Sequence, residues 1–160
     1  MLSLIVGENA SGKTLYLDNI YCTEDCVYNR RMEEARMRPI DRELVRKVYP
    51  DAVLGTDIVL PVQLAYDEIE VQRWLHFMLK KSDILLLDEI DAVACQSDKY
   101  ILYKAAMLIS KYKSVIAATH DEDFTAFADR VCTVRNGSLV DLTRDEMLWE
   151  IYRDEKMVTS

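Results

Sequence analysis

The sequence is organised around the stretch Gly7-Glu8-Asn9-Ala10-Ser11-Gly12-Lys13-Thr14. It fits G-x-x-x-x-G-K-[ST], the pattern of a phosphate-binding loop. The apolar run 2–6 before it has the length of a buried strand, and the residues 15–21 after it can continue as a helix. The pattern thus stands between a strand and a helix N-terminus, where free backbone N–H groups and the helix dipole attract phosphate.

Each conspicuous residue of this loop has an expected task. Gly7 and Gly12 allow backbone angles and a close approach that a Cβ atom would block. Lys13 can reach the β- and γ-phosphates of a nucleotide, and the Thr14 hydroxyl can hold Mg²⁺. We expect the whole loop from Gly7 to Thr14, together with Leu15 behind it, to bind the nucleotide.

Composition limits the remaining possibilities. The chain has 160 residues, half of them apolar, and a formal net charge of −8. This size predicts one domain over 1–160, with a helical or irregular insertion at about 30–80. An acidic surface repels nucleic acid on average, although five arginines cluster at 30–42 and could contact an acidic partner or nucleic acid. No apolar run has the length of a membrane span and no signal peptide is evident, so we expect a cytoplasmic protein.

The four cysteines suggest no metal centre. Cys22 and Cys26 are spaced as C-x-x-x-C, but no second pair of cysteines or histidines completes a set of four zinc ligands. Cys95 and Cys132 lie in apolar surroundings and are expected to be small core residues. Disulfides are not expected in the reducing compartment where a nucleotide-binding enzyme works.

Helical and strand patterns alternate along the rest of the chain. We predict helices over 30–38, 42–48, 66–81, 98–112, 122–128 and 144–156, and strands over 26–28, 83–89 and 114–120, with a possible strand inside 51–60. Strands over 131–134 and 138–142 flank Asn136-Gly137, which is a strong two-residue hairpin signal. The alternation predicts a three-layer α/β fold with a mainly parallel sheet, closed by a C-terminal hairpin and helix.

Polar residues follow two of the predicted buried strands. Asp88 and Glu89 end the run Leu85-Leu86-Leu87, and His120 follows another apolar run. Because ligands of parallel α/β sheets lie at the carboxyl ends of strands, these residues should meet the phosphate-binding loop at one rim. Asp88 is placed to bind Mg²⁺ opposite Thr14, Glu89 to orient or deprotonate a water, and His120 to contact the γ-phosphate.

Two further polar residues are weaker candidates. Gln63, upstream of the helix predicted over 66–81, could sense the Mg²⁺ or the attacking water. His76 lies on the polar side of that helix and is expected to be a surface residue.

Taken together, these residues resemble the ABC-type ATPase domain. Gly7–Thr14 is similar to that family's G-x-N-G-S-G-K-[ST], with Asn9 and Ser11 matching. Further similar segments are Leu85–Glu89 (Walker B with a catalytic glutamate), Ala118–Asp121 (the switch histidine), and Ala128–Val131 with Arg135–Val140 (the closing hairpin). The resemblance implies the P-loop NTPase fold and ATP with Mg²⁺ as ligands. It also implies hydrolysis in which Lys13, Glu89 and His120 are catalytic and Thr14 and Asp88 hold the metal.

The resemblance also implies a role. By its resemblance to the DNA-repair, chromosome-organising and phage-defence branches of this family, we expect a nucleotide switch coupled to a protein partner. A homodimer is possible, and nucleic acid is expected only through a partner. The family's signature L-S-G-G-Q has no clean copy; the nearest segment is 66–73, whose Asp67 and Glu68 would bring negative charge towards phosphate.

Two alternatives remain open. Leu87–Ala92 also resembles the Walker B strand of AAA+ ATPases, although no helical lid domain is evident after it. The degenerate signature, and the absence of a place for an aromatic residue that stacks on adenine, would also suit an assembly module that binds ATP without hydrolysing it.

Overall fold

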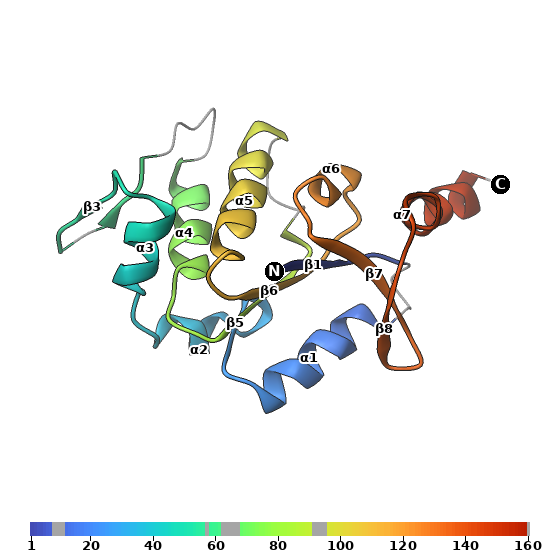
Figure 1. Cartoon of the computed structure of the whole chain (residues 1–160), viewed down its shortest axis with the longest axis horizontal. Helices are drawn as coiled ribbons and strands as arrows, with labels where there is room; N and C mark the ends of the chain where they lie inside the picture. Colours follow the sequence, from blue (N-terminus) through green and yellow to red (C-terminus); the bar gives the residue numbers. More distant parts are fainter. Residues whose placement is uncertain (8–11, 57, 62–67, 91–95, 160) are drawn as a thin grey trace.

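The structure is a computed structural model of the whole chain, and it describes residues 1–7, 12–56, 58–61, 68–90 and 96–159. Its centre is a six-stranded sheet in the order β2-β5-β6-β1-β7-β8 (Figure 1). All neighbours in this sheet are parallel except the last pair. The strands are β1 (Leu2–Ile5), β2 (Cys26–Tyr28), β5 (Ile84–Asp88), β6 (Ser114–Ala118), β7 (Arg130–Arg135) and β8 (Ser138–Asp141).

Helices cover both faces of this sheet, and a separate hairpin lies at one end of the molecule (Figure 1). The helices are α1 (Lys13–Thr23), α2 (Met32–Arg36), α3 (Arg42–Val48), α4 (Glu68–Met78), α5 (Gln96–Ile109), α6 (Glu122–Thr125) and α7 (Arg144–Thr159). The hairpin pairs β3 (Val53–Leu54) with β4 (Ile58–Val59). Among the described residues, no helix is long and apolar enough to cross a membrane.

The two-residue period of each strand divides the core into layers. Leu85 and Leu87 of β5 pack with α3, α4 and α5, whereas Leu86, between them, packs on the opposite face with Leu17 of α1. Successive strand side chains point to opposite faces, and both faces are covered, so the strands consist of continuous apolar runs. A third, smaller cluster holds α7 through Met147 and Ile151 against Val6.

The expected fold is confirmed, with corrections to individual elements. The first helix begins at Lys13, directly after Gly12 in the left-handed region (φ 89°), and residues 15–21 continue it as expected. The helix predicted over 30–38 is split into a 3-10 turn, Asn29–Arg31, and the shorter α2, because Arg31 leaves helical angles (φ −129°, ψ 53°). Asp41 caps α3, as its sequence position indicates, by accepting a hydrogen bond from the Leu44 N–H at 3.1 Å.

The helix predicted over 66–81 is α4 (Glu68–Met78) in the structure, and its apolar period predicts a buried stripe of Val71, Trp74, Leu75 and Met78 widened by Ile69 and Leu79. Val71, Leu75 and Met78 are buried as expected, but Ile69 is 68% exposed. At 100° per residue, Ile69 lies about 200° around the helix from Val71, which puts it on the opposite face. Including it in the apolar stripe was therefore wrong.

Candidate nucleotide site

The sheet order brings four chain segments to one rim. β6 lies between β1 and β5, and β2 flanks β5 on its other side. Since these four strands are parallel, the loops that follow them leave the sheet at the same edge. The residues after β1, β2, β5 and β6 are therefore neighbours, although they are far apart in the chain.

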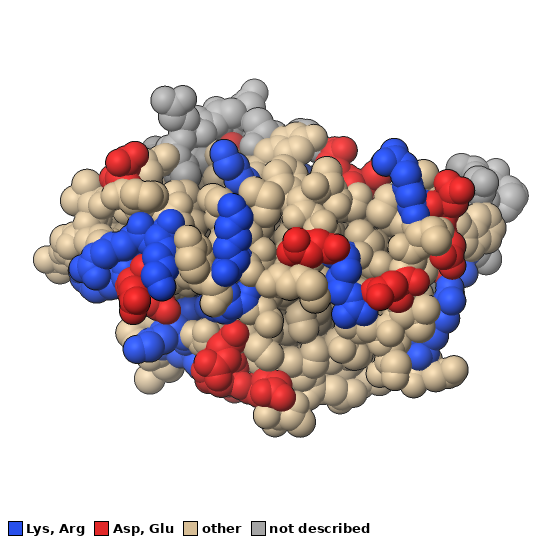
Figure 2. All heavy atoms as spheres, viewed as in Figure 1, with Lys and Arg blue, Asp and Glu red and all other residues tan. Residues whose placement is uncertain are grey.

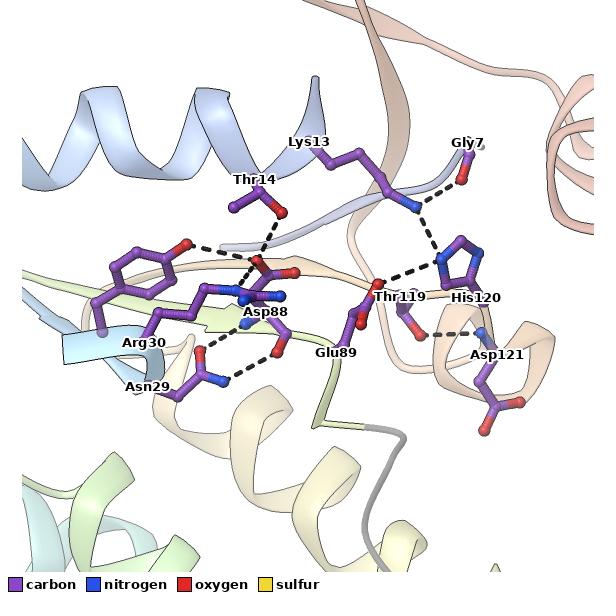
Figure 3. A network of polar contacts seen from close by, with 11 residues as sticks. Gly7, Lys13, Thr14, Asn29, Arg30, Asp88, Glu89, Thr119, His120 and Asp121 are labelled. Carbon is purple, nitrogen blue, oxygen red and sulfur yellow. Dashed lines mark hydrogen bonds and ion pairs between the residues drawn. The ribbon is translucent and has the colours of Figure 1, made fainter. Parts of the chain in front are cut away.

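Lys13 lies at the centre of this rim. Its side chain comes from the first turn of α1 and is only 3% exposed. The ammonium donates to the Gly7 carbonyl at 2.5 Å and lies 3.1 Å from His120 Nε2 (Figure 3). Gly7 itself has a φ of 142°, which a residue with a Cβ atom rarely adopts. The loop thus holds a buried cation whose two partners, a backbone carbonyl and an imidazole nitrogen, are uncharged acceptors that an anion can replace.

Thr14 and Asp88 face one another across the rim. The Thr14 hydroxyl donates to Asp88 Oδ2 at 2.9 Å. Asp88 ends β5 and is almost fully buried. Within the described part of the chain, its second oxygen, Oδ1, is buried and has no hydrogen-bond partner. A buried carboxylate oxygen without a donor costs free energy, and a hard cation is a natural partner for it.

The residues after β2 hold Asp88 in place, a role that we did not predict from the sequence. The Asn29 side chain bridges the Asp88 backbone, accepting from its N–H at 2.7 Å and donating to its carbonyl at 2.9 Å. Arg30 Nε contacts Asp88 Oδ2 at 2.5 Å. The Tyr28 hydroxyl lies 3.5 Å from the same oxygen, and burial raises the pKa of this phenol, with the Asp88 charge adding to the effect. Sequence reasoning missed this role because it depends on β2 pairing with β5, which the short apolar run 26–28 does not reveal.

Glu89 and His120 form the other half of the site. His120 Nε2 lies 3.4 Å from Glu89 Oε1, so the imidazole stands between this carboxylate and the Lys13 ammonium (Figure 3). Glu89 has a φ of 60°, the left-handed region that non-glycine residues seldom adopt. Its N–H donates to the Ala118 carbonyl at 2.9 Å, which anchors this conformation to β6. Backbone strain of this kind is concentrated at functional sites.

The segment that carries His120 is fixed from behind. Asp121 caps α6 and also accepts from the Tyr103 hydroxyl of α5 at 2.5 Å. The Tyr103 ring stacks on Phe124 with centroids 4.1 Å apart. The Asp121 N–H donates to the Thr119 hydroxyl at 3.0 Å, which closes the turn around His120. These contacts limit where the imidazole can move.

Some of the predicted residues lie outside the part of the chain that the structure describes, and two others, Leu15 and His76, are placed as follows. Glu8, Asn9, Ala10, Ser11, Gln63 and Cys95 lie outside the described residues, as do the first two residues of the signature-like segment 66–73. The side chain of Leu15 is 64% exposed on the first turn of α1. His76 is half-buried instead of lying freely on the surface, because its Nε2 lies 3.1 Å from the Ile58 carbonyl of β4.

The arginine cluster is largely engaged within the chain. Arg30 pairs with Asp88, Arg38 with Asp25, and Arg42 donates to the carbonyls of the β3–β4 hairpin. Lysine and arginine side chains nevertheless gather over the end of the molecule that carries α3 and α4, mixed with acidic ones (Figure 2). Cys22 and Cys26, the two cysteines spaced as C-x-x-x-C, are both free thiols; Cys22 is exposed and Cys26 is buried, and burial raises the Cys26 pKa to about 11.

This architecture is the three-layer P-loop NTPase fold, closed by the hairpin β7–β8 and the terminal helix α7. No protein-family model matches the chain, and a search of curated proteins finds no significant match.

Solved structures with the same fold do exist. One is of an RNase-L inhibitor, with a TM-score of 0.60 and 19% identity, covering 96% of this chain and 36% of that one. Another is the complex of the archaeal ribosomal stalk protein aP1 with the archaeal ribosome recycling factor aABCE1, with a TM-score of 0.59 and 19% identity, covering 98% of this chain and 37% of that one. The chain therefore spans a little over a third of the length of either structure, and the likeness is one of fold.

Proposed function

We propose that this chain is an ATPase of the ABC type, which binds Mg·ATP at the rim formed by the loops after β1, β2, β5 and β6. The observation that carries the proposal is the contact chain from Lys13 through His120 to Glu89, beside the Thr14–Asp88 pair. Together these residues supply a buried cation, a metal-ligand pair, an imidazole and a carboxylate, which are the groups that phosphoryl transfer to water needs.

The roles follow from the positions of these groups. The Lys13 ammonium would leave the Gly7 carbonyl and bind phosphate oxygens, because a charge-assisted bond to phosphate is stronger than one to a neutral carbonyl. Glu89, whose side chain is 41% exposed, can orient a water and accept its proton as the water oxygen bonds to the γ-phosphorus and the bond to the bridging oxygen breaks. His120 can donate to the γ-phosphate on the same side.

The metal fits the residues that would hold it. Asp88 Oδ1 is a buried oxygen with no donor among the described residues, and the Thr14 hydroxyl lies beside the same carboxylate. When bound there, Mg²⁺ would neutralise charge that develops on the phosphate oxygens.

We further propose that residues 1–160 act as a single ATPase domain, and that its nucleotide state is communicated to a protein partner. The support for a partner is indirect: one structure of the same fold is a complex with a ribosomal stalk protein. The partner of this chain is a separate question from hydrolysis and can be tested after it.

Turnover and binding measured side by side test the proposal. The purified chain should release phosphate from ATP only when Mg²⁺ is present. Glu89→Gln should lower kcat about 10²- to 10⁴-fold, the usual contribution of a general base, while ATP affinity changes little. Lys13→Ala should abolish binding itself.

Two results would contradict this proposal. Equal rates for Glu89→Gln and the wild type would remove Glu89 from the mechanism. Tight binding of ATP with no turnover, alone or with candidate partners, would instead identify a module that uses ATP only for assembly.

A further inference from the structure

The Arg30–Asp88 ion pair has no task in the proposed reaction. Arg30 belongs to the 3-10 turn after β2, and its Nε lies 2.5 Å from Asp88 Oδ2. The Asp88 side chain is 1% exposed, whereas that of Arg30 is 46% exposed. A buried carboxylate thus has a half-exposed counter-ion, which lies beside it in Figure 3.

The two oxygens of Asp88 are used unequally. Oδ2 accepts hydrogen bonds from the Thr14 hydroxyl at 2.9 Å and from Arg30 Nε at 2.5 Å, and the Tyr28 hydroxyl lies 3.5 Å from it. Oδ1 is buried and receives no donor from the described residues. The donors therefore crowd onto one oxygen, and the guanidinium occupies the same carboxylate that a metal would need.

We infer that Arg30 is a positioning residue that competes with Mg²⁺ for Asp88 and so sets the metal affinity of the site. The inference rests on the proposed function. A guanidinium and a divalent cation on one carboxylate repel each other, because both are positively charged. Metal entry must therefore weaken the Arg30–Asp88 contact, and the half-exposed Arg30 side chain has solvent into which it can withdraw.

The ion pair also explains how Asp88 stays ordered before metal arrives. A buried carboxylate without a counter-ion is costly, and removing one partner of such a pair leaves that cost in place. Asn29 fixes the Asp88 backbone, while Arg30 and Thr14, with the more distant Tyr28 hydroxyl, hold the direction of the Asp88 side chain. Arg30 thus helps to preform the metal ligand and at the same time lowers its affinity for the metal.

The test is metal binding, independent of turnover. Mn²⁺ affinity is measured by electron paramagnetic resonance at pH 8 with saturating ADP, for the wild type, Arg30→Met, Arg30→Lys and Arg31→Met. Arg30→Met should bind Mn²⁺ at least about tenfold more tightly, because the metal then neutralises a buried charge that has lost its partner. The Mn²⁺ affinity of Arg30→Lys should lie closer to that of the wild type, since lysine keeps the positive charge beside Asp88.

Arg31→Met is the matched control, because the Arg31 guanidinium lies 5.9 Å from the Tyr21 ring centroid and donates to the Arg30 backbone carbonyl at 3.3 Å, while the Arg30 side chain is the one that contacts Asp88. It should bind Mn²⁺ as the wild type does. Circular dichroism melts of all four proteins establish that each is folded at the temperature of the measurement.

The outcomes separate the two claims. Equal or weaker Mn²⁺ binding by Arg30→Met, beside clear binding by the wild type, overturns this inference and leaves the proposed function standing. If neither protein binds Mn²⁺ with ADP, the proposed function fails and the inference fails with it. Binding by Arg30→Met that the wild type lacks supports the inference.

Discussion

Gly12 offers a prediction whose size follows from the backbone. It precedes α1 with a φ of 89°, and a Cβ atom added there would meet Val134 Cγ1 at 3.9 Å, an ordinary van der Waals contact. Gly12→Ala therefore incurs the backbone cost of the left-handed region, about 1–2 kcal/mol, without a steric clash against the described residues. In a chain of this size that corresponds to about 2–4 °C in Tm for each kcal/mol.

Gly137 provides the matched control. It lies in the β7–β8 turn with a φ of 76°, and a Cβ atom added there would meet no described atom within 4 Å. Gly137→Ala should lose a similar free energy of unfolding in urea. Only Gly12→Ala should also weaken ATP binding, because it alone shifts the N-terminus of α1, which presents Lys13.

Two results would refute this reasoning. A loss well above about 3 kcal/mol for Gly12→Ala would mean that a steric clash, and not the backbone angle, sets the cost. Unchanged stability together with unchanged ATP affinity would mean that Gly12 does not adopt the left-handed conformation on which the loop depends.

Three further predictions concern the surrounding structure. Burial lowers the pKa of Lys113 to about 8, so the unfolded chain binds more protons than the folded one above that pH. In urea titrations, the free energy of unfolding of the wild type should therefore rise relative to that of Lys113→Met by about 2 kcal/mol between about pH 8 and 10. Tyr103→Phe removes the hydrogen bond to Asp121 and should lower the free energy of unfolding in urea by about 2 kcal/mol. An unchanged urea midpoint would contradict this contact. Asp41→Ala should cost about 1 kcal/mol through the lost α3 cap, and Asp41→Asn should restore most of it.

Much of the fold follows from local pattern. Continuous apolar runs predicted β5 and β6 as central strands because both faces of a parallel sheet are covered. Asn136-Gly137 predicted the hairpin because both residues adopt positive φ, 53° and 76°. The position of Asp88 and His120 at strand ends, combined with the parallel direction, was enough to expect them at the same rim.

The neighbours of Asp88 could not be found in the same way. Asn29 and Arg30 contact Asp88 across 59 and 58 residues, and β2 in front of them has only three residues. A short strand gives little periodicity, and Arg30 stands in a run of charges typical of a solvated surface. Their role depends on which strand lies beside β5, a tertiary property that no window of sequence contains.

The central claim is that the rim holds a magnesium-bound triphosphate. A crystal structure with Mg²⁺ and a non-hydrolysable ATP analogue tests it most directly. We expect γ-phosphate oxygens within hydrogen-bonding distance of Lys13 Nζ and His120 Nε2, and a metal bound through Thr14 and Asp88. A nucleotide seated elsewhere, or a triphosphate here that neither Lys13 nor His120 contacts, would contradict it.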